Sequence, residues 1–340
     1  MTQTSSSRFD IRSLVRRPEF AALLGTVAVY VFFSIFGGAE FLAIGGLSSW
    51  MNIAAELGII ALPVALVMIA GDLDLSVGST FAASAISMAV ISGYFGNPTW
   101  VGIIAALLLS LLIGFINGII VTKTNLPSFV VTLAVSFACV GLTLGLTRLI
   151  TGTVAVDITP DELPKAIFGT QLDGNWETAI LFWIGFALIT SWILYKTKYG
   201  NWIFAIGGDV VSAKATGIPV DKVRIALFVA SAFGAGLVGV IQTSLYNSAQ
   251  VAAGSSFVFN SIIAVVVGGV LLTGGYGSTL GVILGTMTFA IVNQGIYYTG
   301  WDSDWASLII GVLLLIAVLT NNTFRRLALG GGKKSTKESK

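Results

Sequence analysis

Two carboxylates, two residues apart, interrupt an otherwise apolar stretch of the chain. Asp72 and Asp74 lie between an apolar run over 57–70 and a second apolar run that resumes at 81. A charged Asp at the centre of a membrane helix costs roughly 2.5 to 3.5 kcal/mol on insertion scales, so such residues usually face protein or water. Intramembrane carboxylates bind polar solutes or take up protons, and both kinds of chemistry belong to membrane transport.

Glycines flank the two carboxylates, at Gly71 and Gly78, and Pro63 lies upstream. This pattern predicts a broken or re-entrant helix, which lipid tolerates only where protein buries it or a cavity lies beside it. A plain cytoplasmic turn between two helices is the alternative interpretation. Residues 269–279 weakly repeat the pattern of 70–80, and this internal repeat suggests a second helix break at 273–277. In either case the surrounding sequence is that of a membrane channel or transporter.

The composition excludes a soluble globular protein. Of the 340 residues, 55% are hydrophobic and 10% are charged, against about 25% charged in a typical soluble domain. The chain has no histidine, which removes the commonest general base, proton relay and zinc ligand. Its one cysteine, Cys139, has no partner for an intrachain disulfide. We therefore expect no catalytic residues, no metal site and no nucleic-acid partner.

Apolar segments of membrane-spanning length follow one another along the chain. We predict an all-α polytopic membrane protein with about ten transmembrane helices, one or two of them broken or re-entrant. The predicted spans are 20–37, 47–70, 75–92, 99–121, 127–148, 178–196, 225–245, 257–273, 279–297 and 305–322. Residues 1–19 then form an N-terminal tail, 20–323 the transmembrane domain and 324–340 a C-terminal tail.

The distribution of basic residues favours ten spans with both termini in the cytoplasm. Sixteen of the 18 lysines and arginines fall in segments on one predicted side, and only Arg148 and Lys165 fall on the other. The positive-inside rule makes the basic side the cytoplasm. An error of one span would scramble this segregation.

Two long connections between the spans are suited to contacts with partners. The external segment 149–177 is expected to be a capping helix or a docking surface for an extracytoplasmic partner, or else a loosely ordered loop. In the internal loop 197–224, Asp209 is a candidate N-cap for a short helix over 210–216, with Gly217 as its stop. Such a helix suits docking into a partner's groove, and the alternative is a solvated loop that holds two spans at a fixed angle.

No P-loop motif for ATP binding occurs in the chain, since the nearest match, 330–335, lacks both the spacing and a preceding strand. If ATP drives transport, another subunit must bind the nucleotide. Ion coupling would use Asp72, Asp74 and Glu56, for which the predicted spans offer no basic partner. A proton-coupled secondary transporter and a membrane scaffold without cargo remain as alternatives.

Uncharged polar and aromatic side chains in the spans suit a hydroxylated solute better than an ion. Amides and hydroxyls can hydrogen-bond such a solute, and aromatic rings can stack on the apolar face of a sugar. Taken singly, each of them also fits interhelical hydrogen bonding or core packing. The candidates are Ser76, Ser79, Asn117, Gln242, Asn247, Asn293, Gln294, Trp50, Phe129, Phe257 and Tyr297.

Three motifs and a glycine-rich region resemble the permease subunits of bacterial ATP-binding-cassette importers for monosaccharides. This ribose-type branch also includes branched-chain amino acid permeases. The matching stretches are 74–79 (Asp-Leu-Ser-Val-Gly-Ser), 126–133 (Leu-Pro-Ser-Phe-Val-Val-Thr-Leu), 200–219 and 268–278. They occur in family order and cover most of the chain from about 60 to 300. Asp72 stands where the family usually has glycine, which leaves open whether Asp72 tunes cargo choice. Asp209 stands where the family usually has asparagine, an exchange of one N-cap residue for another.

The resemblance implies the permease fold of an importer in the bacterial inner membrane, carrying a monosaccharide or related polyol, in a chain that is not an enzyme. Two cytoplasmic ATPase subunits, which would bind the ATP and Mg, are expected to dock on 201–219. A periplasmic sugar-binding protein is expected on the external loops, and a second permease copy would complete a dimer. An amino acid importer is an alternative. Two carboxylates without a basic partner fit it poorly, because an amino acid zwitterion needs paired charges at its site.

On this basis we assign hypothetical roles to single residues. The candidate pathway residues are Asp72, Asp74, Ser76, Phe129, Asn293 and Gln294. The candidate coupling residues are Gly207, Gly208, Asp209, Ala213 and Gly217.

Overall fold

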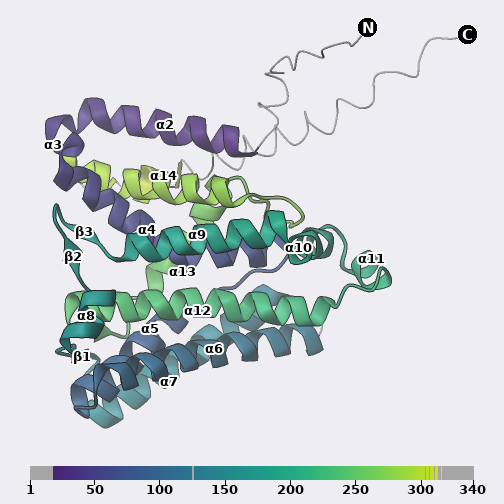
Figure 1. Ribbon diagram of the computed structural model, residues 1–340, viewed down its shortest axis with the longest axis horizontal. Helices are drawn as coiled ribbons and strands as arrows, with labels where there is room; N and C mark the ends of the chain where they lie inside the picture. Colours follow the sequence, from purple (N-terminus) through teal and green to yellow (C-terminus); the bar gives the residue numbers. More distant parts are fainter. Residues whose placement is uncertain are drawn as a thin grey trace, which may run out of the picture.

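Long apolar helices run side by side between the two ends of the molecule (Figure 1). The computed structural model describes residues 18–124, 126–302, 304–305, 307–309, 311–312 and 315. In this part of the chain, eight helices are long and apolar enough to cross a membrane. The chain is therefore an all-α polytopic membrane protein, as the composition and hydropathy predict.

The eight long helices match eight of the predicted spans, with ends that shift by a few residues. They are α2 (Pro18–Phe36), α4 (Ile44–Ile69), α5 (Val77–Met88) with its continuation η1 (Ala89–Tyr94), α6 (Thr99–Thr124), α7 (Ser128–Thr151), α9 (Ala179–Lys196), α12 (Val220–Tyr246) and α14 (Thr279–Tyr298). A short α3 (Gly38–Leu42) joins α2 to α4.

The other two predicted spans differ from these eight. In place of the eighth, the structure has α13 (Ser255–Val267), a helix of 13 residues. At 1.5 Å per residue it reaches only about 20 Å and does not cross the membrane by itself. The predicted tenth span, 305–322, lies mostly outside the described residues, and both predicted tails fall outside them apart from 18–19.

The centre of the bundle is α4, which packs on α9, α12, α13 and α14. In its most apolar window, 94% of the residues are buried, whereas the corresponding value for α7 is 11%. Over residues 57–69 the sequence of α4 is apolar on all sides, as a helix surrounded by protein requires. By contrast, α7 presents most of its surface away from the rest of its own chain.

One end of the bundle is capped by the segment that precedes α9. Strand β1 (Ala155–Asp157) pairs antiparallel with β4 (Ser248–Gln250), which follows α12. After α8 (Glu162–Phe168), strands β2 (Gln171–Leu172) and β3 (Trp176–Glu177) form a second antiparallel pair. Segment 149–177 is thus an ordered cap containing a helix, and the strands in it were not predicted.

The opposite end carries two short helices, α10 (Lys198–Gly208) and α11 (Val210–Ala215), as Figure 1 shows. Helix α11 was predicted, but α10 was not, because its buried positions, Ile203 and Ile206, are too few to give a clear apolar period. The predicted boundary of this loop at 224 is wrong. Helix α12 begins at Val220, after Pro219, and so includes Arg224.

Candidate functional site

Residues 70–76 form a non-helical connection between α4 and α5, in which Asp72, Asp74 and Ser76 are buried and Gly71 is exposed. Helix α4 ends at Ile69, and Gly71 adopts φ +88°, a left-handed conformation that glycine takes without steric cost. The chain then continues without helical structure until α5 begins at Val77. The connection is therefore a non-helical turn between two helices, and protein buries its polar side chains.

The carboxylate of Asp74 is fully buried and accepts three hydrogen bonds. Its Oδ1 accepts from the Ser76 N–H at 2.9 Å and from Ser76 Oγ at 2.7 Å, and its Oδ2 accepts from Ser231 Oγ at 2.7 Å. Asn117 Nδ2 on α6 donates to Ser76 Oγ at 2.7 Å. All four side chains are 0% exposed. These bonds offset the desolvation of the carboxylate and join α5, α6 and α12 at one point.

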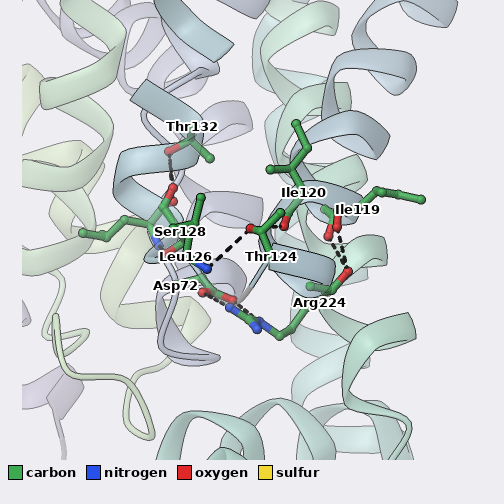
Figure 2. Close-up of polar contacts among 11 residues, drawn as sticks. Asp72, Ile119, Ile120, Thr124, Leu126, Ser128, Thr132 and Arg224 are labelled. Atoms are coloured by element: carbon green, nitrogen blue, oxygen red, sulfur yellow. Dashed lines mark hydrogen bonds and ion pairs between the residues drawn. The ribbon is translucent and has the colours of Figure 1, made fainter. Parts of the chain in front are cut away.

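The first turn of α7 holds the backbone of the same connection. The N–H groups of Leu73 and Leu75 donate to Ser128 Oγ and Thr132 Oγ1, each at 3.0 Å. Ser128 and Thr132 are four residues apart and therefore lie on one helix face, beside Asp72 in Figure 2. Two of the sequence motifs, 74–79 and 126–133, thus belong to one structural unit.

Asp72 has a basic partner, and the prediction that it has none is wrong. Arg224 Nε donates to Asp72 Oδ2 at 2.6 Å and Arg224 Nη2 binds Asp72 Oδ1, which gives a two-point ion pair (Figure 2). The Asp72 side chain is 7% exposed and that of Arg224 19%. Arg224 and Ser231 lie two turns apart on α12, so one face of this helix holds both carboxylates.

Backbone of three segments meets at a set of glycines, here called the glycine junction: Gly71, Gly207, Gly274 and Gly275. The Gly275 N–H donates to the carbonyl oxygen of Ile69 at 2.8 Å. A Cβ atom on Gly207 would lie 1.8 Å from that same oxygen, and one on Gly274 would lie 2.7 Å from Gly71 Cα. Only glycines allow this approach. The junction joins the end of α10 to both non-helical breaks, 70–76 and 268–278.

Comparison with known proteins identifies the family. Residues 46–318 match the family described as the permease component of branched-chain amino acid transport systems. The chain belongs to this permease family. The family indicated by the sequence motifs is thereby confirmed.

Relatives of this permease include a probable ABC transporter permease of Sinorhizobium fredii, 34% identical over 80% of this chain and 81% of that protein. The ribose import permease of Escherichia coli is 30% identical, covering 94% of this chain and 98% of that one. The fructose import permease of Rhizobium meliloti is 28% identical, with 92% and 87% covered. The solved structure of PsaBC from Streptococcus pneumoniae in complex with Fab aligns with TM-score 0.48 and 18% identity, covering 86% of the permease and 99% of that chain.

In the permease, helix α11 is capped as predicted. Asp209 Oδ1 accepts from the Ser212 N–H at 2.6 Å, and this bond holds the pKa of Asp209 below its ordinary value of 3.8. Gly217 follows α11 with φ +85°. Ala213 is 3% exposed and anchors α11 to the body, whereas a Cβ atom on Gly208 would meet no atom within 4 Å.

The other candidate pathway residues are not among the hydrogen-bond partners of Asp74. Phe129 is 48% exposed, on α7. On α14, Gln294 Oε1 accepts from Ser49 Oγ at 2.7 Å, and Gln294 Nε2 donates to Asn293 Oδ1 at 3.2 Å. The structure therefore brings together Asp72, Asp74 and Ser76 and leaves the other three on two separate helices. The partners that sequence reasoning missed are Arg224, which was predicted to lie in a loop, and Ser231, which lies within the predicted span 225–245.

Proposed function

We propose that this permease forms the translocation pathway for a monosaccharide or related polyol in an ATP-driven importer of the bacterial inner membrane. The observation that carries the proposal is that 94% of the chain aligns with a ribose import permease, at 30% identity. The similarity to a fructose import permease supports the same class of solute. The hydroxyl and amide side chains of the spans suit such a solute, because a sugar offers hydroxyls and no ionic group.

Helices α10 and α11 would receive a cytoplasmic ATPase subunit, which binds the ATP and Mg. Val211 on α11 is 76% exposed, and a capped helix with an exposed apolar side chain suits a groove in a partner. Helix α10 reaches the glycine junction through Gly207. A shift of α10 would therefore move the α4–α5 and α13–α14 connections together, because backbone in direct contact leaves little room for independent motion.

The pathway itself would involve Phe129, Asn293 and Gln294, while Asp72, Asp74 and Ser76 hold the connection in place. Asp74 is enclosed by its own chain and has no access to a solute in this conformation. The partly exposed side chains on α7 and α14 carry no such restriction.

Asp74→Asn is expected to destabilise the permease without changing its apparent affinity for solute. The amide can accept fewer bonds from Ser76 and Ser231, and its own N–H₂ then faces their hydroxyls, at a cost of about 1–3 kcal/mol. Thermal unfolding of the purified variant and the KM of uptake in vesicles measure the two effects. A raised KM at unchanged stability would instead assign Asp74 to the pathway.

The capped end of the bundle is proposed to face the periplasm and to receive a sugar-binding protein. Lys123, Lys198 and Lys214 belong to the α10–α11 end, whereas Asp157 and Glu162 lie in the cap around β1 and α8. The positive-inside rule supports a cytoplasmic α10–α11 end. We propose that both termini lie on that side as well.

A second copy of the permease is proposed to pack on α7. This helix exposes a row of small residues at Ala134, Ala138, Gly141 and Gly145. Close helix–helix approach in membranes uses such rows, because small side chains allow backbones to come near one another. The dimer would place Phe129, on the same helix, close to the interface.

Gly141→Leu is expected to shift the purified permease from dimer to monomer by about tenfold in the dissociation constant, the equivalent of roughly 1.4 kcal/mol. A Cβ atom at this position meets nothing within 4 Å in the single chain, so the variant should fold. Gly25→Leu on α2 is the control, with the same open space. Equal dimer dissociation in the two variants would exclude α7 as the interface.

The transport assignment is tested by reconstituting the permease in vesicles with its ATPase subunit and its binding protein. We expect ATP-dependent uptake of radiolabelled ribose or fructose and no uptake of leucine. Leucine uptake would favour the amino acid importer, which the family description also covers. Uptake that persists without the ATPase but collapses with an uncoupler would favour a proton-coupled carrier.

A further inference from the structure

A second buried polar cluster lies toward the capped end of the bundle, apart from the Asp74 site. Glu56 on α4 accepts from Gln242 Nε2 on α12 at 2.7 Å. One turn away, Asn52 Oδ1 accepts from the Glu177 N–H at 3.1 Å, and Asn52 Nδ2 donates to the Asn175 carbonyl at 2.8 Å. Residues 52 and 56 share one face of α4, so this face binds the β2–β3 hairpin through Asn52 and α12 through Glu56.

Two carboxylate oxygens in this cluster have no hydrogen-bond partner. They are Glu56 Oε1 and Glu177 Oε2. The two residues are only 7% and 8% exposed, and the Glu177 backbone is bonded to Asn52, one turn from Glu56 on α4. Among the described residues, the three ion pairs are Lys123–Asp221, Lys214–Asp221 and Arg224–Asp72, none of which reaches this cluster. Two buried carboxylates in this situation cannot both ionise without a large penalty.

The neighbouring elements supply no neutralising cation. Gln171 on β2 lies opposite Glu177 in the hairpin, and the phenol of Tyr246 on α12 lies within electrostatic reach of both carboxylates. Lys165 on α8 donates to Asn247 Oδ1 at 3.1 Å instead. The titratable side chains of α9 are in its last turns, at the other end of the bundle: Tyr195 and Lys196.

The donor set also argues against a metal ion as the missing charge. Metal ions with oxygen ligands take about six donors. Here the Asn52 oxygen is already occupied by the Glu177 N–H, which leaves two free carboxylate oxygens. No group of three or more metal-ligating acidic, His or Cys side chains occurs in the part of the chain that the structure describes.

We propose that Glu56 and Glu177 form a proton-binding site that holds one proton between them at neutral pH and loosens the β2–β3 hairpin when that proton is released. The proton comes from the solvent on the capped side of the bundle. With it bound, the pair carries one negative charge; without it, two like charges face each other across the contact between α4 and the hairpin. The site belongs to this chain alone and does not depend on the solute that the permease carries.

Burial raises the pKa of Glu177 above its ordinary value of 4.5, in agreement with this arrangement. Because the folded state then binds the proton more tightly than the unfolded state, the contribution to stability is complete below the ordinary pKa. It is lost as pH rises through the raised value.

Infrared difference spectroscopy of the full chain in lipid, recorded between neutral and alkaline pH, tests the site. The wild type is expected to lose a protonated-carboxyl C=O band on alkalinisation. The double variant Glu56→Gln/Glu177→Gln should remove that band, while Glu162→Gln, an exposed acid on α8, should retain it. A wild type without such a band, or a band that survives in the double variant, overturns the proposal.

Hydrogen exchange in the β2–β3 hairpin gives an independent readout at a single pH. Under alkaline conditions the wild-type hairpin amides, including that of Glu177, should exchange several-fold faster than those of Glu56→Gln, which keeps a neutral group of the same shape. Because both proteins are compared at one pH, the intrinsic exchange rate cancels. Equal exchange in the two proteins would show that proton release does not loosen the hairpin.

Discussion

Gly207→Ala is expected to reduce ATP-driven uptake by about tenfold or more. A Cβ atom at this position would lie 1.8 Å from the carbonyl oxygen of Ile69, the oxygen that already accepts from the Gly275 N–H. Backbone must therefore shift, and overpacking of this kind costs about 1–3 kcal/mol. The strain falls where α10 meets both connections, so transmission from the ATPase to the spans should suffer. Uptake in vesicles, normalised to permease content, measures the effect.

The adjacent residue provides a matched control. A Cβ atom on Gly208 would meet nothing within 4 Å, so Gly208→Ala should transport at close to the wild-type rate. The two variants add the same methyl group to neighbouring positions of one helix and differ only in what that methyl meets. Equal uptake by both would mean that the glycine junction does not transmit the ATPase movement, and a defect at Gly208 alone would point to direct ATPase contact there.

Asp72→Asn is expected to destabilise the permease by about 3 kcal/mol or more, since removal of one member of a buried ion pair leaves the other charge uncompensated. The two-point pair with Arg224 is largely buried, so solvent screens it little. Thermal unfolding of the purified chain measures the loss. Replacing both members by leucine should restore most of the stability, because apolar residues of similar volume carry no desolvation penalty.

An exposed ion pair at the same end of the molecule is the control. Lys123 and Asp221 approach to 3.6 Å, with side chains 66% and 39% exposed. Lys123→Gln should cost less than about 1 kcal/mol, as solvent-exposed pairs do. If Lys123→Gln and Asp72→Asn lowered stability equally, or if the double leucine variant were as unstable as Asp72→Asn, the Asp72–Arg224 pair would not be the restraint proposed for the connection.

Most of the spans were predictable because lipid imposes one rule on every one of them. A helix that crosses the hydrocarbon needs about 20 apolar residues, and this requirement is visible in any window of sequence. Local capping was equally predictable, because the Asp209 side chain accepts from the Ser212 N–H only three residues away. The stop at Gly217 depends only on the positive φ of that residue. Helix α13 and helix α10 were harder, because a short helix contains too few turns to show its period.

The polar partners were not predictable in the same way. Asp74 bonds to Ser231, and Asp72 to Arg224, each across more than 150 residues of chain. The sequence indicated that these carboxylates needed protein or water around them but not which groups would supply it. An error of five residues in the start of α12 was enough to leave Arg224 in a loop and to hide the ion pair.

The amino-acid sequence by itself determined the membrane character of this protein, its family, most of its spans and the capped helix α11. Each of these depends on interactions within one segment or between that segment and lipid. Only the tertiary structure decided that residues 70–76 are held by α6, α7 and α12, and that Gly71, Gly207 and Gly274 meet. Those contacts join distant segments, and the packing of whole helices sets their geometry.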